Sequence, residues 1–198
     1  MTTVQQHQTS DILRQPDFSL HETNSCIALN EESHLLRTID SQPWLTDLKR
    51  RVQHYGYRYD YSAREVTEAS RLDPLPDWLA EIGARLVSEG HFEREPDQVI
   101  INEYLPGQGI EPHIDRETCF GPTISTLSLS SAITMNFTHA ETGERVSERL
   151  EPRSLLTLKG DARYKWRHGI APRKSDMVEG ARVPRGRRVS LTFRTVLL

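Results

Sequence analysis

The sequence predicts an α+β protein in which helices come first and a series of short strands follows. Three observations support this prediction. The chain has 198 residues, a length that fits one compact domain better than two. Its first half has two segments with apolar residues at helical spacing, and from Val99 onward the apolar residues form short β-rich runs. Helices followed by many short strands are typical of a two-sheet sandwich or jelly roll with helices covering one sheet.

Two helices are expected in the N-terminal half. Residues 1–16 show neither helical nor alternating periodicity, so we expect a mobile tail there and a single domain at 17–198. Asn30 precedes two glutamates and the apolar set Leu35, Leu36 and Ile39, which is the pattern of a short capped helix. A second apolar set at helical spacing lies around Pro76: Leu75, Leu79, Ile82 and Leu86.

The remaining expected elements are strands, separated by Gly, Pro and polar turns. They are Val99–Leu105, Ile124–Ser130, Ile133–Phe137, Ser154–Leu158 and Val189–Val196. The chain contains no internal repeat and no clear linker.

Composition excludes several classes of protein. Hydrophobic residues make up 36% of the chain and charged residues 27%, a balance that favours a folded core over global disorder. The longest apolar run is far too short for a membrane span, and the polar N-terminus lacks a signal-peptide pattern. Cys26 and Cys119 are too few for a disulfide framework or a thiolate zinc site. We therefore expect a monomeric cytoplasmic protein with two free thiols and no membrane association.

Charge is distributed unevenly along the chain. Residues 151–198 contain 12 Lys and Arg against 4 Asp and Glu, a local net charge of +8, which leaves −11 for residues 1–150. A basic region of this kind indicates either a nucleic-acid or other anionic partner or a solvated basic face.

A candidate metal site begins at His113-Ile114-Asp115, which follows a turn-rich stretch and lies where a strand resumes. Because side chains alternate along a strand, His113 and Asp115 would point to one side. His168, far along the chain, is the candidate third ligand. Two imidazoles and a carboxylate form the facial triad of non-haem Fe(II) oxygenases, although an isolated His-x-Asp more often lies on a protein surface without binding metal.

The C-terminal strand offers a cationic anchor for an anionic co-substrate. Its even positions form a polar row that ends in two arginines, Arg188 and Arg194, while the odd positions are apolar. We expect this row to face a polar cavity, since Arg binds carboxylates in bidentate fashion; the alternative is an amphipathic edge strand with arginines in solvent. Asn102 and Tyr104 alternate on another strand and are further candidates for co-substrate contact, or ordinary polar residues of a strand.

Together these motifs resemble the AlkB family of Fe(II)/2-oxoglutarate dioxygenases, and most of all the oxygenase domain of AlkB-type tRNA wobble-uridine hydroxylases. The resemblance runs from about Gln53 to Arg194. The matching motifs are Asn102-x-Tyr104, Pro106-Gly107-Gln108-Gly109-Ile110, His113-x-Asp115, Leu127-Ser128-Leu129, Pro152-Arg153-Ser154-Leu155-Leu156, His168-Gly169-Ile170 and Arg188-x-x-x-x-x-Arg194.

The resemblance implies a double-stranded β-helix fronted by a nucleotide-recognition lid. It implies Fe(II) held by His113, Asp115 and His168, with 2-oxoglutarate and O2 as co-substrates. Asn102 and Arg194 would hold one carboxylate of 2-oxoglutarate, and Tyr104 and Arg188 the other. Some members have Asn where this chain has Ser190, which weakens any co-substrate contact there. The residue two places after the metal carboxylate contacts the base in repair-type members, which makes Glu117 a substrate-contact candidate.

The expected substrate is an alkyl group on a nucleic-acid base, with RNA favoured and DNA also possible, and the group is removed by dealkylation or left hydroxylated. Tyr55, Tyr57, Tyr59 and Tyr61 alternate on an apparent strand and would share a face for base stacking, or pack against a helix. The basic residues around His168 would contact phosphates: Arg163, Lys165, Arg167, Arg173 and Lys174.

Two other functions fit the same scaffold. One is hydroxylation of a small molecule or a protein side chain, because fold does not determine substrate. The other is a non-catalytic binding module with a vestigial iron site, which the presence of all three ligands and both arginines disfavours. Succinate formation would distinguish an enzyme from a binding module.

Overall fold

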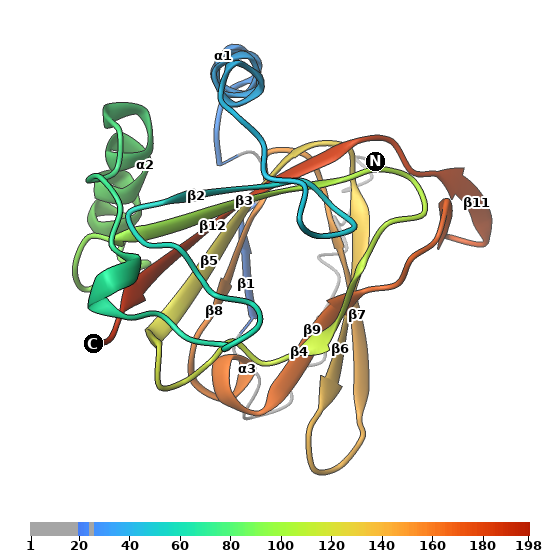
Figure 1. Ribbon diagram of the computed structural model, residues 1–198. Coiled ribbons are helices and arrows are strands. Elements are labelled where there is room, and N and C mark those ends of the chain that lie inside the picture. The colour runs from blue at the N-terminus through green and yellow to red at the C-terminus, as the bar shows by residue number, and fades with distance from the viewer. Residues whose placement is uncertain (1–19, 24–25) are drawn as a thin grey trace, which may run out of the picture.

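The computed structural model describes residues 20–23 and 26–198, so the tail expected at residues 1–16 lies outside the described residues. Two antiparallel sheets face each other, and two helices cover the larger one (Figure 1). In chain order the elements are β1 (Leu20–Thr23), α1 (Leu29–Ser41), β2 (Val52–Tyr55), the 3-10 helix η1 (Glu68–Ser70), α2 (Asp77–Ser88), β3 (Gln98–Tyr104), β4 (Ile110–His113), β5 (Phe120–Ser130), β6 (Ile133–His139), β7 (Arg145–Leu150), β8 (Leu155–Leu158), α3 (Gly160–Tyr164), β9 (Trp166–Ile170), β10 (Ser175–Val178), β11 (Ala181–Pro184) and β12 (Arg188–Val196).

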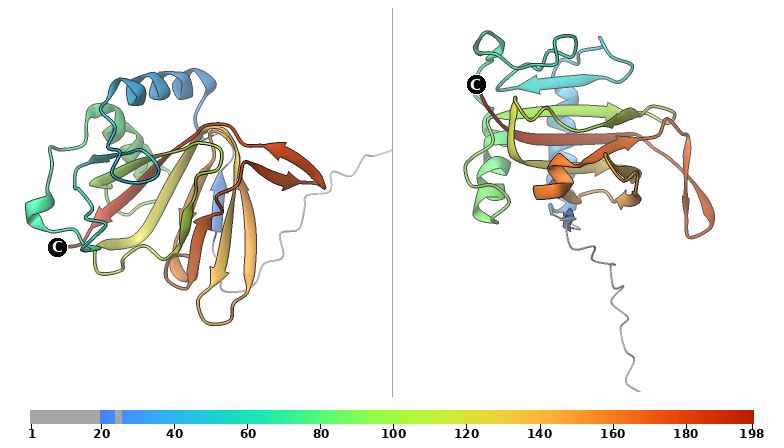
Figure 2. Two further views of the ribbon diagram at one scale, coloured as in Figure 1. Left: turned by 45° about the vertical axis from the view of Figure 1, so that its right-hand side comes forward. Right: turned by 90° about the horizontal axis from the view of Figure 1, so that it is seen from below.

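The strands alternate between the two sheets. The larger sheet has the order β1-β8-β5-β12-β3-β2, and the smaller sheet has the order β4-β9-β6-β7. From β3 to β6 each successive strand crosses to the other sheet, which is the connectivity of a jelly roll. Strands β10 and β11 form a separate hairpin that projects from the body (Figures 1 and 2). The expected α+β jelly roll is confirmed.

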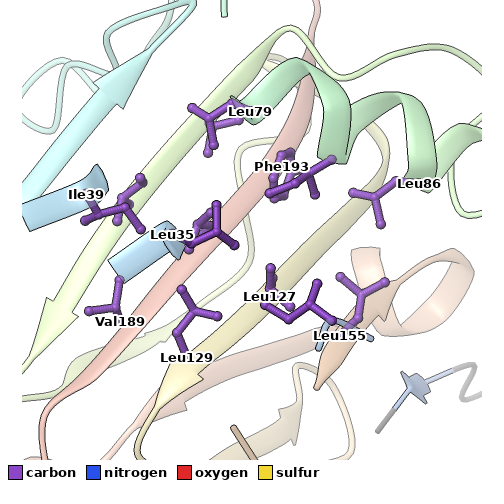
Figure 3. Packing of buried hydrophobic residues seen from close by; sticks show 14 of the residues in the cluster. Leu35, Ile39, Leu79, Leu86, Leu127, Leu129, Leu155, Val189 and Phe193 are labelled. Atoms are coloured by element: carbon purple, nitrogen blue, oxygen red, sulfur yellow. The ribbon is translucent and has the colours of Figure 1, made fainter. Parts of the chain in front are cut away.

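The outer face of the larger sheet packs against α1 and α2 to form the first of two cores. Figure 3 shows Leu35 and Ile39 of α1 and Leu79 and Leu86 of α2 against the sheet. On β12 the odd positions belong to this core: Val189, Leu191 and Phe193 are each fully buried. Because β12 pairs with β5 on one side and β3 on the other, it is a central strand and not the edge strand that the sequence also allowed.

The second core lies between the sheets. It contains Ile124 and Leu156 of the larger sheet and Met135, Phe137 and Trp166 of the smaller one. Since period-two alternation places the even residues of β12 on this side, the polar row of that strand faces the space between the sheets.

Both expected helices are present, and the first begins earlier than the sequence indicated. Ala28 occupies the N-cap position of α1, so Asn30 is not the cap, and within the described residues this end has no side-chain cap hydrogen bond. The backbone N–H of Cys26 donates to the carbonyl of Arg153 at 2.7 Å, which fixes the chain just before the helix starts. In the described part of the chain, no helix is long and apolar enough to cross a bilayer.

The tyrosine stripe (Tyr55, Tyr57, Tyr59 and Tyr61) does not form one strand, so the prediction of a shared face is wrong. Strand β2 ends at Tyr55, and Gly56 has a positive φ of 74°, which turns the chain. Tyr55 consequently packs edge-on against Trp78 of α2, with ring centroids 5.6 Å apart. Tyr57 and Tyr59 instead pack against the core between the sheets. For Tyr55 the alternative of packing against a helix is correct.

Candidate metal centre and its cavity

Three potential metal ligands meet beside the cavity between the sheets. His113 ends β4 and pairs directly with His168 of β9, although the two lie 55 positions apart in the chain. Asp115 follows just after the strand. One ligand atom from each residue lies within 4.8 Å of the others, and the imidazole centroids are 4.5 Å apart. The structure therefore brings together the three residues that the sequence predicted.

Hydrogen bonds orient two of these side chains and leave atoms free for a metal. Nδ1 of His113 lies 2.9 Å from the carbonyl oxygen of Glu111, which favours the proton on Nδ1 and leaves Nε2 as a ligand. Nη2 of Arg194 donates to Oδ1 of Asp115 at 3.0 Å. Oδ2 of Asp115 and Nδ1 of His168 are buried without a hydrogen-bond partner among the described residues. Because unpaired buried polar atoms are costly, this donor set fits a bound cation.

The electrostatics of the site favour the same protonation states that metal binding requires. Burial tends to raise the pKa of Asp115, but Arg194 and the two imidazoles hold that pKa well below its usual range. Burial and the neighbouring His113 lower the pKa of His168 to about 3. At neutral pH the site thus presents a charged carboxylate and a neutral imidazole, as metal ligands must be.

The three ligands line a cavity of about 650 Å³ between the sheets. Its walls include every even position of β12 from Arg188 to Arg194, together with Asn102 and Tyr104 of β3. The predicted polar row therefore faces a cavity shared with the metal ligands.

Arg188 lies in this wall as a buried cation. It is 1% exposed, and Nη2 donates to Oγ of Ser128 at 2.9 Å. Its Nε has no partner, and no carboxylate pairs with it among the described residues. The Tyr104 ring centroid lies 5.5 Å from the guanidinium carbon. Burial lowers the pKa of Arg188 to about 10, so the side chain is still cationic at neutral pH.

Arg194 and Asn102 already have protein partners. Arg194 pairs with Asp115, and its guanidinium lies over the Phe120 ring at 4.7 Å. Oδ1 of Asn102 accepts a hydrogen bond from Nε of Arg50 at 2.8 Å. Arg50 also lies 5.8 Å from the Tyr104 ring centroid and lines the cavity. Sequence reasoning missed Arg50, although it lies only a few residues before the matching segment that starts at about Gln53.

The cavity has a basic and aromatic mouth. Tyr59 and Tyr61 line it, with ring centroids 5.2 Å apart in an edge-on arrangement. Three exposed cations also line it: Lys49, Arg64 and Arg116. Among the described residues that line the cavity, Glu111 is the only acidic residue besides the metal ligand Asp115.

Several predicted substrate residues lie elsewhere. Glu117 is exposed in the turn after Asp115 and does not line the cavity, because the turn directs Arg116 there instead. Tyr55 and Tyr57 also lie outside the cavity. Arg163 is buried and cannot contact phosphate, so its assignment to a nucleic-acid surface is wrong. Arg173 is exposed next to Pro172 of the cavity lining, and its predicted contact with substrate stays a prediction.

Two imidazoles and a carboxylate on a jelly roll, beside a cavity with an unpaired buried arginine, define a class of protein. They are the features of a mononuclear non-haem iron oxygenase that takes an anionic co-substrate.

Comparison with known proteins defines the family more closely. A family model described as 2OG-Fe(II) oxygenase superfamily matches residues 3–194. Uncharacterized protein L905 of Acanthamoeba polyphaga mimivirus is 38% identical over 173 residues, covering 85% of this chain and 80% of that protein. The mouse tRNA (carboxymethyluridine(34)-5-O)-methyltransferase ALKBH8 is 39% identical over 194 residues, covering 86% of this chain but only 29% of that protein.

Two further matches are more distant. The zebrafish (Danio rerio) probable RNA/DNA demethylase ALKBH6 is 29% identical over 195 residues, covering 84% of this chain and 80% of that protein. The solved structure of OsALKBH1 has a TM-score of 0.64 at 14% identity, covering 90% of this chain and 97% of that chain. At this identity the structural likeness concerns the fold alone.

The chain belongs to the 2OG-Fe(II) oxygenase superfamily, as an AlkB-type member. It is therefore an Fe(II)- and 2-oxoglutarate-dependent dioxygenase that consumes O2.

Proposed function

We propose that this enzyme oxidises an alkyl group on a nucleic-acid base, with RNA favoured over DNA as the substrate. The observation that carries the proposal is the mouth of the cavity, whose lining combines exposed Lys49, Arg64 and Arg116 with the paired rings of Tyr59 and Tyr61. Cations suit the phosphate backbone, and aromatic rings suit an unstacked base. The names of ALKBH8 and ALKBH6, which refer to tRNA and to RNA or DNA, agree with this chemistry.

The side chains divide the work of the reaction between them. Fe(II) held by His113, Asp115 and His168 supplies O2 activation, coupled to oxidation of 2-oxoglutarate to succinate and CO2. Arg188, the unpaired buried cation, binds one carboxylate of 2-oxoglutarate with help from Tyr104.

The remaining side chains bind the other carboxylate of 2-oxoglutarate and the substrate base. Arg194 and Asn102 bind the second carboxylate, and the pairing of Arg194 with Asp115 keeps it next to the metal ligands. Tyr59 and Tyr61 hold the base so that its alkyl group enters the cavity. The position of the oxidised carbon decides the product. A carbon attached to a ring nitrogen is lost as an aldehyde after hydroxylation, whereas a carbon-linked side chain stays hydroxylated.

A first experiment identifies the substrate. The iron-loaded enzyme is incubated with tRNA, rRNA and alkylated DNA, and the nucleosides are then analysed by mass spectrometry, with His168→Ala as the inactive control. We expect a mass change in one RNA nucleoside that requires 2-oxoglutarate and is missing with the control. Succinate formation without any nucleoside change would favour a small-molecule or protein hydroxylase.

A second experiment tests the mouth of the cavity. We expect Arg64→Gln and Arg116→Gln to reduce the slope of log affinity against log salt for single-stranded RNA by about 0.7 for each phosphate that the variant no longer neutralises. Tyr61→Leu should weaken binding by about 1–3 kcal/mol without changing that slope. Arg145→Gln is the matched control, because Arg145 is exposed on β7 at the opposite edge of the smaller sheet from β4. Failure of both RNA and DNA to bind at low salt would refute the proposal.

A further inference from the structure

Arg163 is a buried cation whose side-chain hydrogen bonds all go to the Asp115 turn and to the first two residues of β5. It lies in the short helix α3, five positions before the metal ligand His168, and is 2% exposed. Nη1 donates to the carbonyl of Asp115 at 2.8 Å, Nη2 to that of Phe120 at 3.2 Å, and Nε to that of Gly121 at 3.2 Å. In the part of the chain that the structure describes, no carboxylate forms an ion pair with this guanidinium.

The three carbonyls lie at the two ends of a single turn. Strand β4 ends at His113 and β5 begins at Phe120, so Asp115 lies in a segment that no sheet ladder holds. Within the turn, the N–H groups of Cys119 and Phe120 both bond to the carbonyl of Arg116. Arg163 therefore ties the metal ligand, near the beginning of this segment, to the start of β5.

Asp115 is consequently held from two sides by two arginines. Arg194 binds its carboxylate at Oδ1, and Arg163 binds its backbone carbonyl. Oδ2 stays without a hydrogen-bond partner among the described residues, and one oxygen of this carboxylate completes the ligand set with the two imidazoles. A backbone fixed at the carbonyl limits rotation of the residue as a whole, and a carboxylate fixed at one oxygen directs the other.

A neutral or shorter side chain could not reproduce this arrangement. Arg offers five N–H donors in a rigid plane, and three of them are used here on three separate carbonyls. The Tyr164 ring, 4.9 Å from the guanidinium carbon, covers one face of the group. Lys at the same position would present a single point charge without the planar fork.

We propose that Arg163 is a positioning residue for the metal centre: it fixes the backbone of the Asp115 turn so that the carboxylate is ready for metal. The same side chain links the two segments that carry ligands, since α3 leads directly into β9 and His168. Groups that orient metal ligands typically change metal affinity by roughly 10- to 100-fold when they are removed.

The test compares Arg163→Lys and Arg163→Met with Arg167→Met, a control at an exposed position one residue from His168. Affinity for Mn(II) and Co(II) is measured by calorimetry, the Co(II) absorption spectrum reports ligand geometry, and thermal unfolding is measured separately in chelator. We expect roughly 10- to 100-fold weaker metal binding and an altered Co(II) spectrum in both Arg163 variants, with parental values in Arg167→Met.

Two results would overturn the proposal. One is a variant at Arg163 that unfolds at lower temperature in chelator but binds metal with parental affinity and an unchanged spectrum, which is the behaviour of a purely structural residue. The other is failure of both variants to fold. Because Arg163→Lys keeps the charge and most of the length of the side chain, misfolding of this variant as well would assign Arg163 to the stability of the whole fold and not to the metal centre.

Discussion

Replacement of Arg188 by methionine should separate co-substrate binding from stability. Without co-substrate, Arg188 is a buried charge that pairs with no carboxylate among the described residues. It donates a hydrogen bond to Ser128 and lies over the Tyr104 ring. Removal of such a cation in favour of an apolar group of similar size is often neutral or stabilising. We therefore expect Arg188→Met to unfold at the parental temperature or slightly above it.

The effect on 2-oxoglutarate should be large. A charge-assisted hydrogen bond contributes about 1.5–3 kcal/mol, and a carboxylate that takes two N–H groups of Arg188 loses about 3–6 kcal/mol in the variant. At about 1.4 kcal/mol for each factor of ten, the Kd should rise by roughly two to four orders of magnitude. Calorimetric titration of 2-oxoglutarate into the Mn(II)-loaded protein measures this directly.

The adjacent residue provides a matched control. Arg187 has the same chemistry but points away from the cavity, where it bonds to Glu103 at 2.6 Å and to Asp40. Arg187→Met should lower the unfolding temperature and leave the affinity for 2-oxoglutarate unchanged. Parental affinity in Arg188→Met, or weakened affinity in Arg187→Met, would show that the anchor lies elsewhere.

The remaining predictions concern stability. The Arg51 hydrogen bond holds the pKa of the buried carboxyl of Glu103 below its ordinary value. This carboxylate therefore stabilises the fold fully at pH values above the ordinary glutamate pKa. The stabilisation is lost as the pH falls through the lowered pKa of the folded state. Glu103→Gln should therefore lower the free energy of unfolding in urea by about 1–3 kcal/mol at neutral pH. The difference in this free energy between variant and parent should shrink in acid. A difference that stays constant with pH would contradict the prediction. Gly56→Ala should cost more than about 3 kcal/mol, because a Cβ would lie 1.9 Å from the carbonyl oxygen of Asp97 at a φ of +74°. Gly90→Ala, at a φ of +78° with nothing within 4 Å, should cost only about 1–2 kcal/mol, and equal losses of stability would refute the steric argument.

Features that depend on local alternation could be predicted from the sequence. The polar and apolar faces of β12 follow from period two. His113 and Asp115 do lie together, but Asp115 comes after the end of β4, so strand alternation does not account for its direction. The helices α1 and α2 follow from the spacing of their apolar residues, which is a local property as well.

Features that depend on distant partners could not be predicted. Arg163 looks like any surface arginine in the sequence, and its burial is decided by carbonyl groups 42 to 48 positions away. Arg50 is held at the cavity by its hydrogen bond to Asn102, 52 positions away. The prediction that the tyrosine stripe shares one face was wrong for a local reason. Gly56 adopts a positive φ that ends the alternation, and a single glycine in a strand-like run did not reveal this.

The pairing of His113 with His168 has a further thermodynamic consequence. β4 is an edge strand that contacts β9 through Ile110 and His113, with an irregular register between them, so few backbone hydrogen bonds secure it. A metal ion bound to both histidines adds a cross-link between these strands and closes a long loop of the chain. Occupancy of the site and order in β4 are therefore linked, and each stabilises the other. Chelation should accelerate amide hydrogen exchange along β4 before it affects the larger sheet, which makes the metal part of the local folding equilibrium of the smaller sheet.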